Sequence, residues 1–322
     1  MKIVTFGEVM LRLSPNLYER WVQTDTFNVV YTGAEANVAV SLANFGEKVA
    51  FVSKFPAHEI GQAAVNSLRK FGVNTDMVVR GGERMGIFFL EKGASQRGGK
   101  VIYDRAHSAI ATAKQSDFDW DKIFEGADWF HLTGITPALS DELAKICLTA
   151  LQKAKEKGLT VSMDLNYRAK LWTLEKARET LKTLLPFVDY CKDLFWFEDG
   201  EQDAESVVQR MMKEFNLKGV FVTFRQAKTA NDHDWSGAFY TNGKSYHSKR
   251  YSMHVVDRVG GGDAFSAGFI YALRNGFAPQ ETVEFAVAAS CLKHTVEGDY
   301  NLVSVNEVLA LAGGDGSGRV QR

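Results

Sequence analysis

The sequence has few of the features that mark disulfide-rich, zinc-binding or membrane proteins. The three cysteines, Cys147, Cys191 and Cys291, are odd in number and far apart, so we expect reduced, buried thiols in a cytoplasmic protein. The histidines form no HxxxH pair and the cysteines no CxxC pair, so no zinc site is expected. No run of 18 apolar residues occurs, which predicts no membrane span. The N-terminus lacks a small-residue cleavage site and reads as a first strand.

An excess of charge of either sign is also missing. The chain has 38 basic and 39 acidic side chains, well mixed along the sequence, which favours neither a nucleic-acid nor a membrane-surface partner. Several nucleotide-binding motifs are absent as well. The lack of GxxxxGK[ST], of the HRD and DFG pair, and of GxGxxG after the first strand excludes P-loop NTPases, protein kinases and typical dinucleotide dehydrogenases.

Short apolar runs alternate with segments of helical periodicity over most of the chain. The predicted buried strands are 2–6, 49–54, 129–133, 160–164 and 219–223, and the predicted helices are 36–45, 61–71, 141–157, 174–185 and 204–215. About 45% of the residues are hydrophobic, enough for a substantial core. Strands that alternate with helices predict an α/β fold, with a mostly parallel sheet covered by helices on both faces.

Two segments interrupt this alternation. Residues 11–32 and 85–107 are rich in alternating and turn-forming residues, which indicates strand pairs rather than crossover helices. We expect them to form a small sheet that stands off the main body as a lid. The prediction is therefore one domain over residues 1–312 with two lid insertions. The glycine-rich residues 313–322 are expected to be a flexible tail.

The stretch DRVGGGDAFSAG, residues 257–268, lies where a predicted strand turns into a helix. Free N–H groups and the helix dipole at such a point favour an anion, and glycines let a ligand approach the backbone closely. Asp263 follows the glycines directly. It could cap the helix, or it could take a proton from an alcohol that attacks a phosphoryl group. The stretch alone does not decide between these two interpretations.

Other polar residues also stand at predicted element ends. Gly33 and Asn37 begin a helix, although ordinary strand-to-helix punctuation explains them too. Tyr103 and Arg105 alternate along a lid strand, whereas Asn166 and Arg168 follow a buried strand at its carboxyl end, where ligands of α/β sheets bind. Converging arginines suit a carboxylate, and surface ion pairs are the alternative. The helix dipole alone accounts for Lys293 and His294 at a helix C-terminus.

These motifs together resemble the ribokinase-like (phosphofructokinase-B type) sugar kinases. DRVGGGDAFSAG is similar to their DTxGAGD motif, and TGAEANVAVSLANFG to their N-terminal glycine–asparagine motif. TFGEVMLRLSP, GGERMGIFFLEKGASQR, KVIYDRAHSAI, DLNYRAKLW and AASCLKHTVEGDYNLVSV most resemble the 2-keto-3-deoxygluconate kinases, and the likeness covers nearly the whole chain. It implies a three-layer α/β/α sandwich with a mostly parallel central sheet and a β-lid.

The resemblance also implies ATP-dependent phosphorylation of a sugar hydroxyl with Mg²⁺, here 2-keto-3-deoxygluconate to its 6-phosphate. Carried over by position, Asp263 is the catalytic base, and Gly260, Gly261 and Gly262 form the anion hole. The implied substrate contacts are Gly33, Asn37, Phe88, Tyr103, Arg105, Asn166 and Arg168, and the implied nucleotide contacts are Thr223, Arg225, Lys293 and His294. Arg105 and Arg168 would recognise the carboxylate of a sugar acid. A homo-oligomer formed through the lid is an arrangement that the resemblance allows.

Two departures from the family pattern leave alternatives open. Phe88 stands where relatives usually have a tyrosine, which removes one hydroxyl. More seriously, no NxxE motif follows PFVDYC, and EDGE at residues 198–201 is only a shifted substitute. We interpret the region between residues 187 and 205 as lacking a segment, with KDLFWF as a loop remnant and one strand in doubt. The metal ligands are therefore unknown. A fructose- or ribose-type kinase, or a ligand-binding member with impaired turnover, stays possible.

Overall fold

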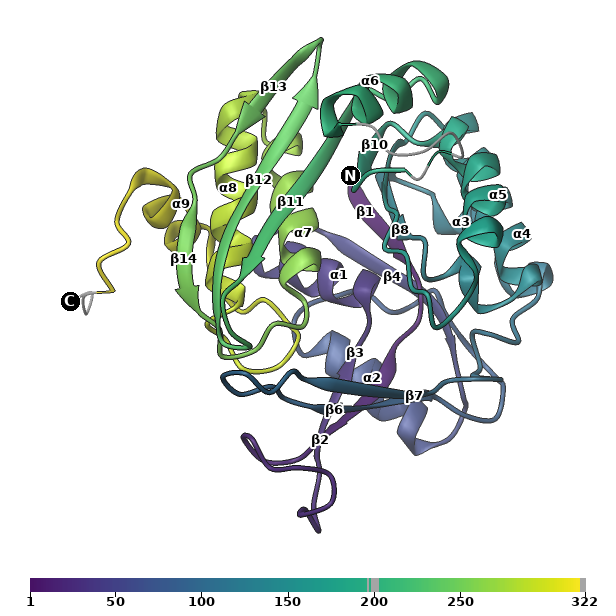
Figure 1. Cartoon of the computed structure of the whole chain (residues 1–322). Coiled ribbons are helices and arrows are strands. Elements are labelled where there is room, and N and C mark those ends of the chain that lie inside the picture. Colours follow the sequence, from purple (N-terminus) through teal and green to yellow (C-terminus); the bar gives the residue numbers. More distant parts are fainter. Residues whose placement is uncertain (196, 198–202, 319–322) are drawn as a thin grey trace.

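A ten-stranded sheet forms the centre of the computed structural model, which describes residues 1–195, 197 and 203–318 (Figure 1). Its strand order is β13-β12-β11-β10-β9-β8-β1-β4-β5, with β14 also paired to β12. Neighbours are parallel from β5 to β11 and antiparallel from β11 onward. The strands are β1 (Lys2–Phe6), β4 (Val49–Phe55), β5 (Val78–Arg80), β8 (Ala127–Thr133), β9 (Thr160–Asp164), β10 (Tyr190–Lys192), β11 (Gly219–Ala227), β12 (Asp232–Thr241), β13 (Lys244–His247) and β14 (Tyr251–His254).

Helices cover both faces of this sheet, as the sequence predicted. In β1, Val4 and Phe6 belong to one hydrophobic cluster and Ile3 to another, because successive side chains point to opposite faces. The first cluster is covered by α3 (Trp120–Ile123), α4 (Asp141–Glu156), α5 (Leu174–Leu184) and α6 (Ala204–Glu214). The second face is covered by α1 (Ala34–Asn44), α2 (Glu59–Arg69), α7 (Gly261–Arg274), α8 (Pro279–Lys293) and α9 (Val305–Gly313). The structure is therefore the expected three-layer α/β/α sandwich.

Helix α4 shows how the sequence produces one of these layers. The hydroxyl of Ser140 accepts the N–H of Leu143 and caps the helix at the predicted start. The apolar residues at helical spacing, including Ile146 and Leu151, are fully buried, and each such side chain contributes roughly 1.5–3 kcal/mol. Cys147 lies on the same face, and all three cysteines are buried and free, as expected.

The two insertions form a separate four-stranded sheet in the order β3-β2-β6-β7, which lies across one end of the main body (Figure 1). Its strands are β2 (Met10–Ser14), β3 (Asn28–Thr32), β6 (Gly86–Glu91) and β7 (Lys100–Asp104). Arg12 of β2 is buried and forms ion pairs with Asp257 and Asp299 of the main body. Because both carboxylates are buried, this contact ties the lid to the loop that precedes α7 and to the segment between α8 and α9.

The structure resolves the doubt about a strand after Val188. Strand β10 is present and pairs in parallel with β9 on one side and β11 on the other. Lys192 ends the strand, and the described residues of KDLFWF that follow it form neither helix nor strand, as expected for a loop, although the rings of Phe195 and Phe197 pack with Phe215 in the core. The proposed substitute EDGE, at residues 198–201, lies outside the described residues. No helix in the described ranges is long and apolar enough to cross a membrane.

Candidate active site

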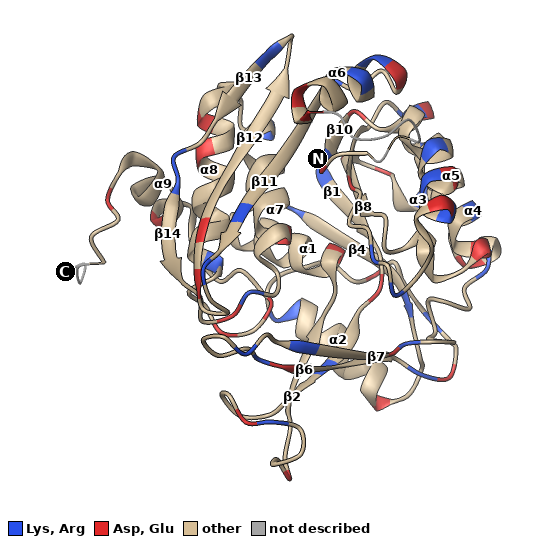
Figure 2. Ribbon diagram, viewed as in Figure 1, with Lys and Arg blue, Asp and Glu red and all other residues tan. Residues whose placement is uncertain are grey.

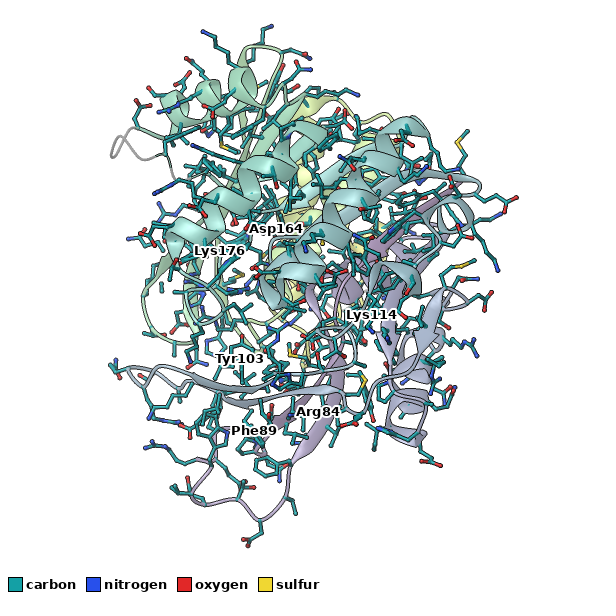
Figure 3. All side chains as sticks on the ribbon, turned by 90° about the vertical axis from the view of Figure 1, so that its right-hand side faces the viewer. Arg84, Phe89, Tyr103, Lys114, Asp164 and Lys176 are labelled. Carbon is teal, nitrogen blue, oxygen red and sulfur yellow. The ribbon has the colours of Figure 1, made fainter. Side chains whose placement is uncertain are left out.

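A cavity of about 710 Å³ lies between the lid and the carboxyl ends of the parallel strands. Its lining joins segments that are far apart in the sequence, among them the lid strands, the start of α1, the ends of β9 and β10, and the glycine turn before α7. Figure 3 shows Tyr103 on the lid and Asp164 in the main body. The cavity is lined by most of the predicted site residues: Gly33, Asn37, Phe88, Tyr103, Arg105, Asn166, Arg168, Thr223, Arg225, Gly260, Gly262, Asp263 and His294.

The glycine turn places the start of α7 directly against this cavity. Gly260 has a φ of 82°, and a Cβ at this position would lie 2.0 Å from the carbonyl oxygen of Asp299, so only glycine fits. The helix begins at Gly261, and the amides of its first turn have no partner within the helix. With the dipole of a 14-residue helix behind them, these amides have the arrangement that suits a phosphate oxygen.

Asp263 is not the helix cap. Gly260 occupies that position and no side chain caps α7, whereas the Asp263 carboxylate accepts a hydrogen bond from the Asn37 side chain at 2.7 Å. Burial raises the pKa of Asp263 to about 6, although this hydrogen bond and Lys192 lower it. A carboxylate with a pKa near 6 is mostly ionised at pH 7, yet is more basic than an ordinary aspartate, as a general base requires. Asn37, predicted beside the site, therefore orients this acid.

The shifted pKa predicts the pH dependence of turnover. If Asp263 must be ionised, kcat/KM should fall about tenfold per pH unit below about pH 6. Because the pKa of Asp263 is higher in the folded than in the unfolded state, the folded state binds this proton more tightly and gains stability as the pH falls. Protonation of Asp263 therefore does not promote unfolding in this range. Burial likewise raises the pKa of Glu35, another cavity residue, to about 7. Burial lowers the pKa of His131 and of His294 to about 4, which acts against stability as the pH falls, so circular dichroism is recorded at each pH and only the range with an unchanged spectrum is used. Within that range we expect the lost activity to return fully at pH 7.5; a plateau of kcat/KM down to pH 5 would contradict this role.

A buried ion pair closes the cavity beneath the glycine turn. Lys192, the last residue of β10, donates to Asp164, the last residue of β9, at 2.7 Å. Asp193 follows with a φ of 70°, a conformation that costs a non-glycine residue energy and is found often at functional sites. Burial raises the pKa of Asp193, and Lys192 opposes that shift. Acidic groups thus do stand at this strand end, where the family motif led us to expect them.

These acids bear on how a magnesium ion could be held. No cluster of three metal-ligating side chains occurs among the described residues. Mg²⁺ with a nucleotide does not need one, because phosphates and waters usually complete its shell around one or two carboxylates. Asp193 and Asp164 line the cavity within reach of the glycine turn. The residues present therefore fit a magnesium ion that arrives with the nucleotide phosphates.

The arginines of the cavity differ in what they already bind. Arg105 is buried and paired with Glu8, which also accepts the hydroxyl of Ser108. In contrast, no carboxylate of the described residues pairs with Arg168, Arg225 or Arg258, which all line the cavity. Burial and the charges of Arg225 and Arg168 lower the pKa of Arg258. Unpaired cations that repel one another indicate an anionic ligand, such as a carboxylate or phosphates. The outer helices differ from the cavity in this respect, because they carry basic and acidic residues interspersed with each other (Figure 2).

Two predicted contacts fall outside the cavity lining. Lys293 is fully buried, and its ammonium donates to the carbonyls of Asp257 and Val296, so the expectation that it borders the nucleotide does not fit its placement. Gly261 packs against the ring of His294 instead of facing the cavity. His294 does line the cavity beside Trp235, with ring centroids 5.0 Å apart, and burial lowers its pKa to about 4. This neutral aromatic pair is suited to a nucleotide base.

Several cavity residues escaped the sequence analysis. Glu8, Asp164 and Arg258 stand inside motifs that were recognised, yet nothing in their spacing showed which partner each would meet. Lys192 and Asp193 were missed because the segment was expected to depart from the fold. The signal that could have found them is the position itself, directly after a buried strand.

The fold and the cavity together define a small-molecule kinase of the ribokinase-like class: a three-layer sandwich, a β-lid, and a carboxylate next to a glycine turn at a helix start. Residues 1–306 match the model of the pfkB family carbohydrate kinases. The chain belongs to this family and is a carbohydrate kinase.

Relatives and a solved structure indicate which carbohydrate kinases this chain resembles. The chain is 34% identical over 319 residues to a 2-dehydro-3-deoxygalactonokinase of Haloferax volcanii, covering 98% of both chains. It is 29% identical over 317 residues to a 2-dehydro-3-deoxygluconokinase of Bacillus subtilis, covering 95% of this chain and 94% of the relative. The crystal structure of a 2-dehydro-3-deoxygluconokinase of Thermotoga maritima has a TM-score of 0.93 and 48% identity, over 98% of this chain and 100% of the other. These similarities support a kinase of sugar acids.

Proposed function

We propose that the protein transfers the γ-phosphoryl group of ATP to the 6-hydroxyl of 2-keto-3-deoxygluconate. The observation that carries this proposal is that one cavity contains both an ionisable Asp263, beside the glycine turn, and Arg168, which lacks a carboxylate partner among the described residues. The first arrangement suits transfer of a phosphoryl group to an alcohol, and the second suits a substrate that carries a carboxylate. The relatives named for such substrates add support.

Each part of the cavity then has a task. Asp263 takes the proton of the attacking hydroxyl, while Asn37 keeps the carboxylate oriented. The amides after Gly260 bind the charge on the phosphoryl oxygens. Arg168 and Arg105 bind the carboxylate of the sugar acid, and Phe88 with Tyr103 closes the lid over its carbon chain.

The nucleotide lies along β11. Thr223 and Arg225 contact its phosphates, and His294 with Trp235 borders its base. Asp193 and Asp164 are the residues that would hold Mg²⁺, which, when bound, neutralises charge on the nucleotide phosphates. A ribokinase-like protein of Escherichia coli with the same fold was solved with ATP and Mg²⁺.

A panel of acceptors tests the proposed substrate. The purified protein is incubated with ATP, Mg²⁺ and one acceptor at a time: 2-keto-3-deoxygluconate, its galactonate epimer, fructose or ribose, and ADP release is measured. We expect the highest kcat/KM with a keto-deoxy acid, by at least about 10²-fold over a neutral sugar, since Arg168 would otherwise stay without a carboxylate partner. Highest turnover with fructose or ribose would overturn the proposal. Binding of ATP and sugar acid without any product would favour the ligand-binding alternative.

A further inference from the structure

Lys192 has an environment that a purely structural ion pair does not explain. Its side chain is only 6% exposed, yet it lines the cavity, between Asp164 and the glycine turn. A Cβ placed on Gly262 would lie 3.1 Å from the Lys192 ammonium, so this nitrogen lies directly against the start of α7. In the part of the chain that the structure describes, the ammonium makes one hydrogen bond, to Asp164 at 2.7 Å. An ammonium has three N–H donors, so two are left without a partner among the described residues and are available to a ligand in the cavity.

Two carboxylates lie beside this ammonium. The Lys192 nitrogen forms an ion pair with the Asp164 carboxylate at 2.7 Å. The distance to Asp193 is 4.0 Å, which is attraction without a hydrogen bond. Lys293, the other lysine beneath the turn, donates to two backbone carbonyls and does not line the cavity. Lys192 is thus a fixed cation with free donors beside Asp263 and the anion cradle.

We propose that Lys192 is a further catalytic residue, whose ammonium contacts the phosphoryl group during its transfer. This inference rests on the proposed function only in taking Asp263 as the base. In the step, the bond from the γ-phosphorus to the sugar oxygen forms and the bond to the bridging oxygen of ADP breaks. The hydroxyl proton goes to Asp263. Lys192 remains an ammonium throughout and stabilises the charge on the transferred group, as a positioned cation does in a site that excludes water.

Two variants separate this role from a structural one. Lys192→Met removes the cation but leaves Asp164 buried without its partner, which destabilises the fold. The double variant Asp164→Asn/Lys192→Met replaces the pair with two neutral side chains of similar size. Because Asp164 is also one of the two acids proposed to hold Mg²⁺, every variant is assayed over a range of Mg²⁺ concentrations and kcat is compared at saturating Mg²⁺. Lys54→Met is the matched control, because Lys54 pairs with Asp117 at the same 2.7 Å, but outside the cavity lining. Thermal unfolding of all variants reports their folding.

We expect kcat to fall about 10- to 100-fold in both Lys192 variants, with little change for Lys54→Met. A double variant with wild-type kcat would overturn the proposal, since Lys192 would then serve only to balance Asp164. The assay uses whichever acceptor of the panel is phosphorylated, together with ATP hydrolysis in the absence of acceptor. Highest turnover with a neutral sugar would therefore overturn the proposed substrate, while the role of Lys192 is still measured.

The pH profile gives a readout that a structural role does not move. The charged groups that face Asp263 are Lys192 and Arg168, which lower its pKa, and Asp164, which raises it. Lys192→Met should shift the acidic limb of kcat/KM to higher pH. In the double variant, loss of Lys192 raises the pKa of Asp263 and loss of Asp164 lowers it. The acidic limb of kcat/KM should therefore return toward its wild-type position, while kcat at the plateau stays low. A plateau that recovers with the limb would mean that Lys192 acts only through the pKa of Asp263, which contradicts direct contact.

Discussion

Replacing Asp263 with asparagine is expected to lower kcat about 10²- to 10⁴-fold, the usual loss when a general base is removed. Asparagine has the same shape and still accepts a hydrogen bond from Asn37, but it cannot take the proton of the attacking hydroxyl. The KM values for ATP and the sugar should change little, because the amides after Gly260 and the arginines remain. The measurement is steady-state release of ADP at pH 7.5 with the best acceptor of the panel.

Stability provides the control for this variant. Because burial raises the pKa of Asp263, its ionised form is disfavoured in the folded state at pH 7.5, and this cost disappears with a neutral side chain. Asp263→Asn should therefore unfold at the same temperature as the wild type or higher, whereas a misfolded variant would unfold lower. The wild-type acidic limb near pH 6 should also vanish from the residual activity. A folded variant with wild-type kcat would exclude Asp263 as the base.

Most helices and strands of the layers could be predicted from the sequence, because the spacing of apolar residues that indicates them is a local property. Where both faces of a strand are packed, as in β12, nearly every residue is buried and the alternation that signals a strand disappears. Strand β10 has only three residues, too few for any periodic signal. Its presence was put in doubt by a missing motif, and the structure shows that the strand is present while the side chains at its end differ.

The candidate site was predictable as a set of residues, but not as a set of partners. Glycines before a helix, and arginines after a strand, can be read from the sequence because strand and helix ends meet at one edge of the sheet. The pairing of Arg105 with Glu8 joins residues 97 positions apart, and that of Arg12 with Asp299 joins residues 287 apart. The pKa of Asp263 depends on its burial, on Asn37 and on Lys192. Such effects arise only from tertiary packing, so no spacing rule reveals them.

Arg168→Ala is expected to lower kcat/KM for the sugar acid about 10²- to 10³-fold, and for fructose or ribose less than about threefold. A desolvated charged contact that loses one partner typically costs 2–5 kcal/mol, and a neutral sugar forms no such contact. Arg168 is the informative arginine because its guanidinium pairs with no described carboxylate, whereas Arg105→Ala would leave the buried Glu8 without its ion-pair partner. The ratio of kcat/KM for acid and neutral acceptors is measured at saturating ATP, which removes any contribution of Arg168 to nucleotide binding.

Arg69→Ala serves as the matched control, since Arg69 ends α2 with about half its side chain exposed and lies outside the cavity lining. It removes the same charge from the chain and should leave both acceptors unaffected. An equal loss for acid and neutral acceptors in Arg168→Ala would mean that this arginine binds the transferred phosphoryl group, which is common to both reactions. The acid-specific loss is therefore the result that connects Arg168 to the carboxylate, and it does so without relying on how any relative is named.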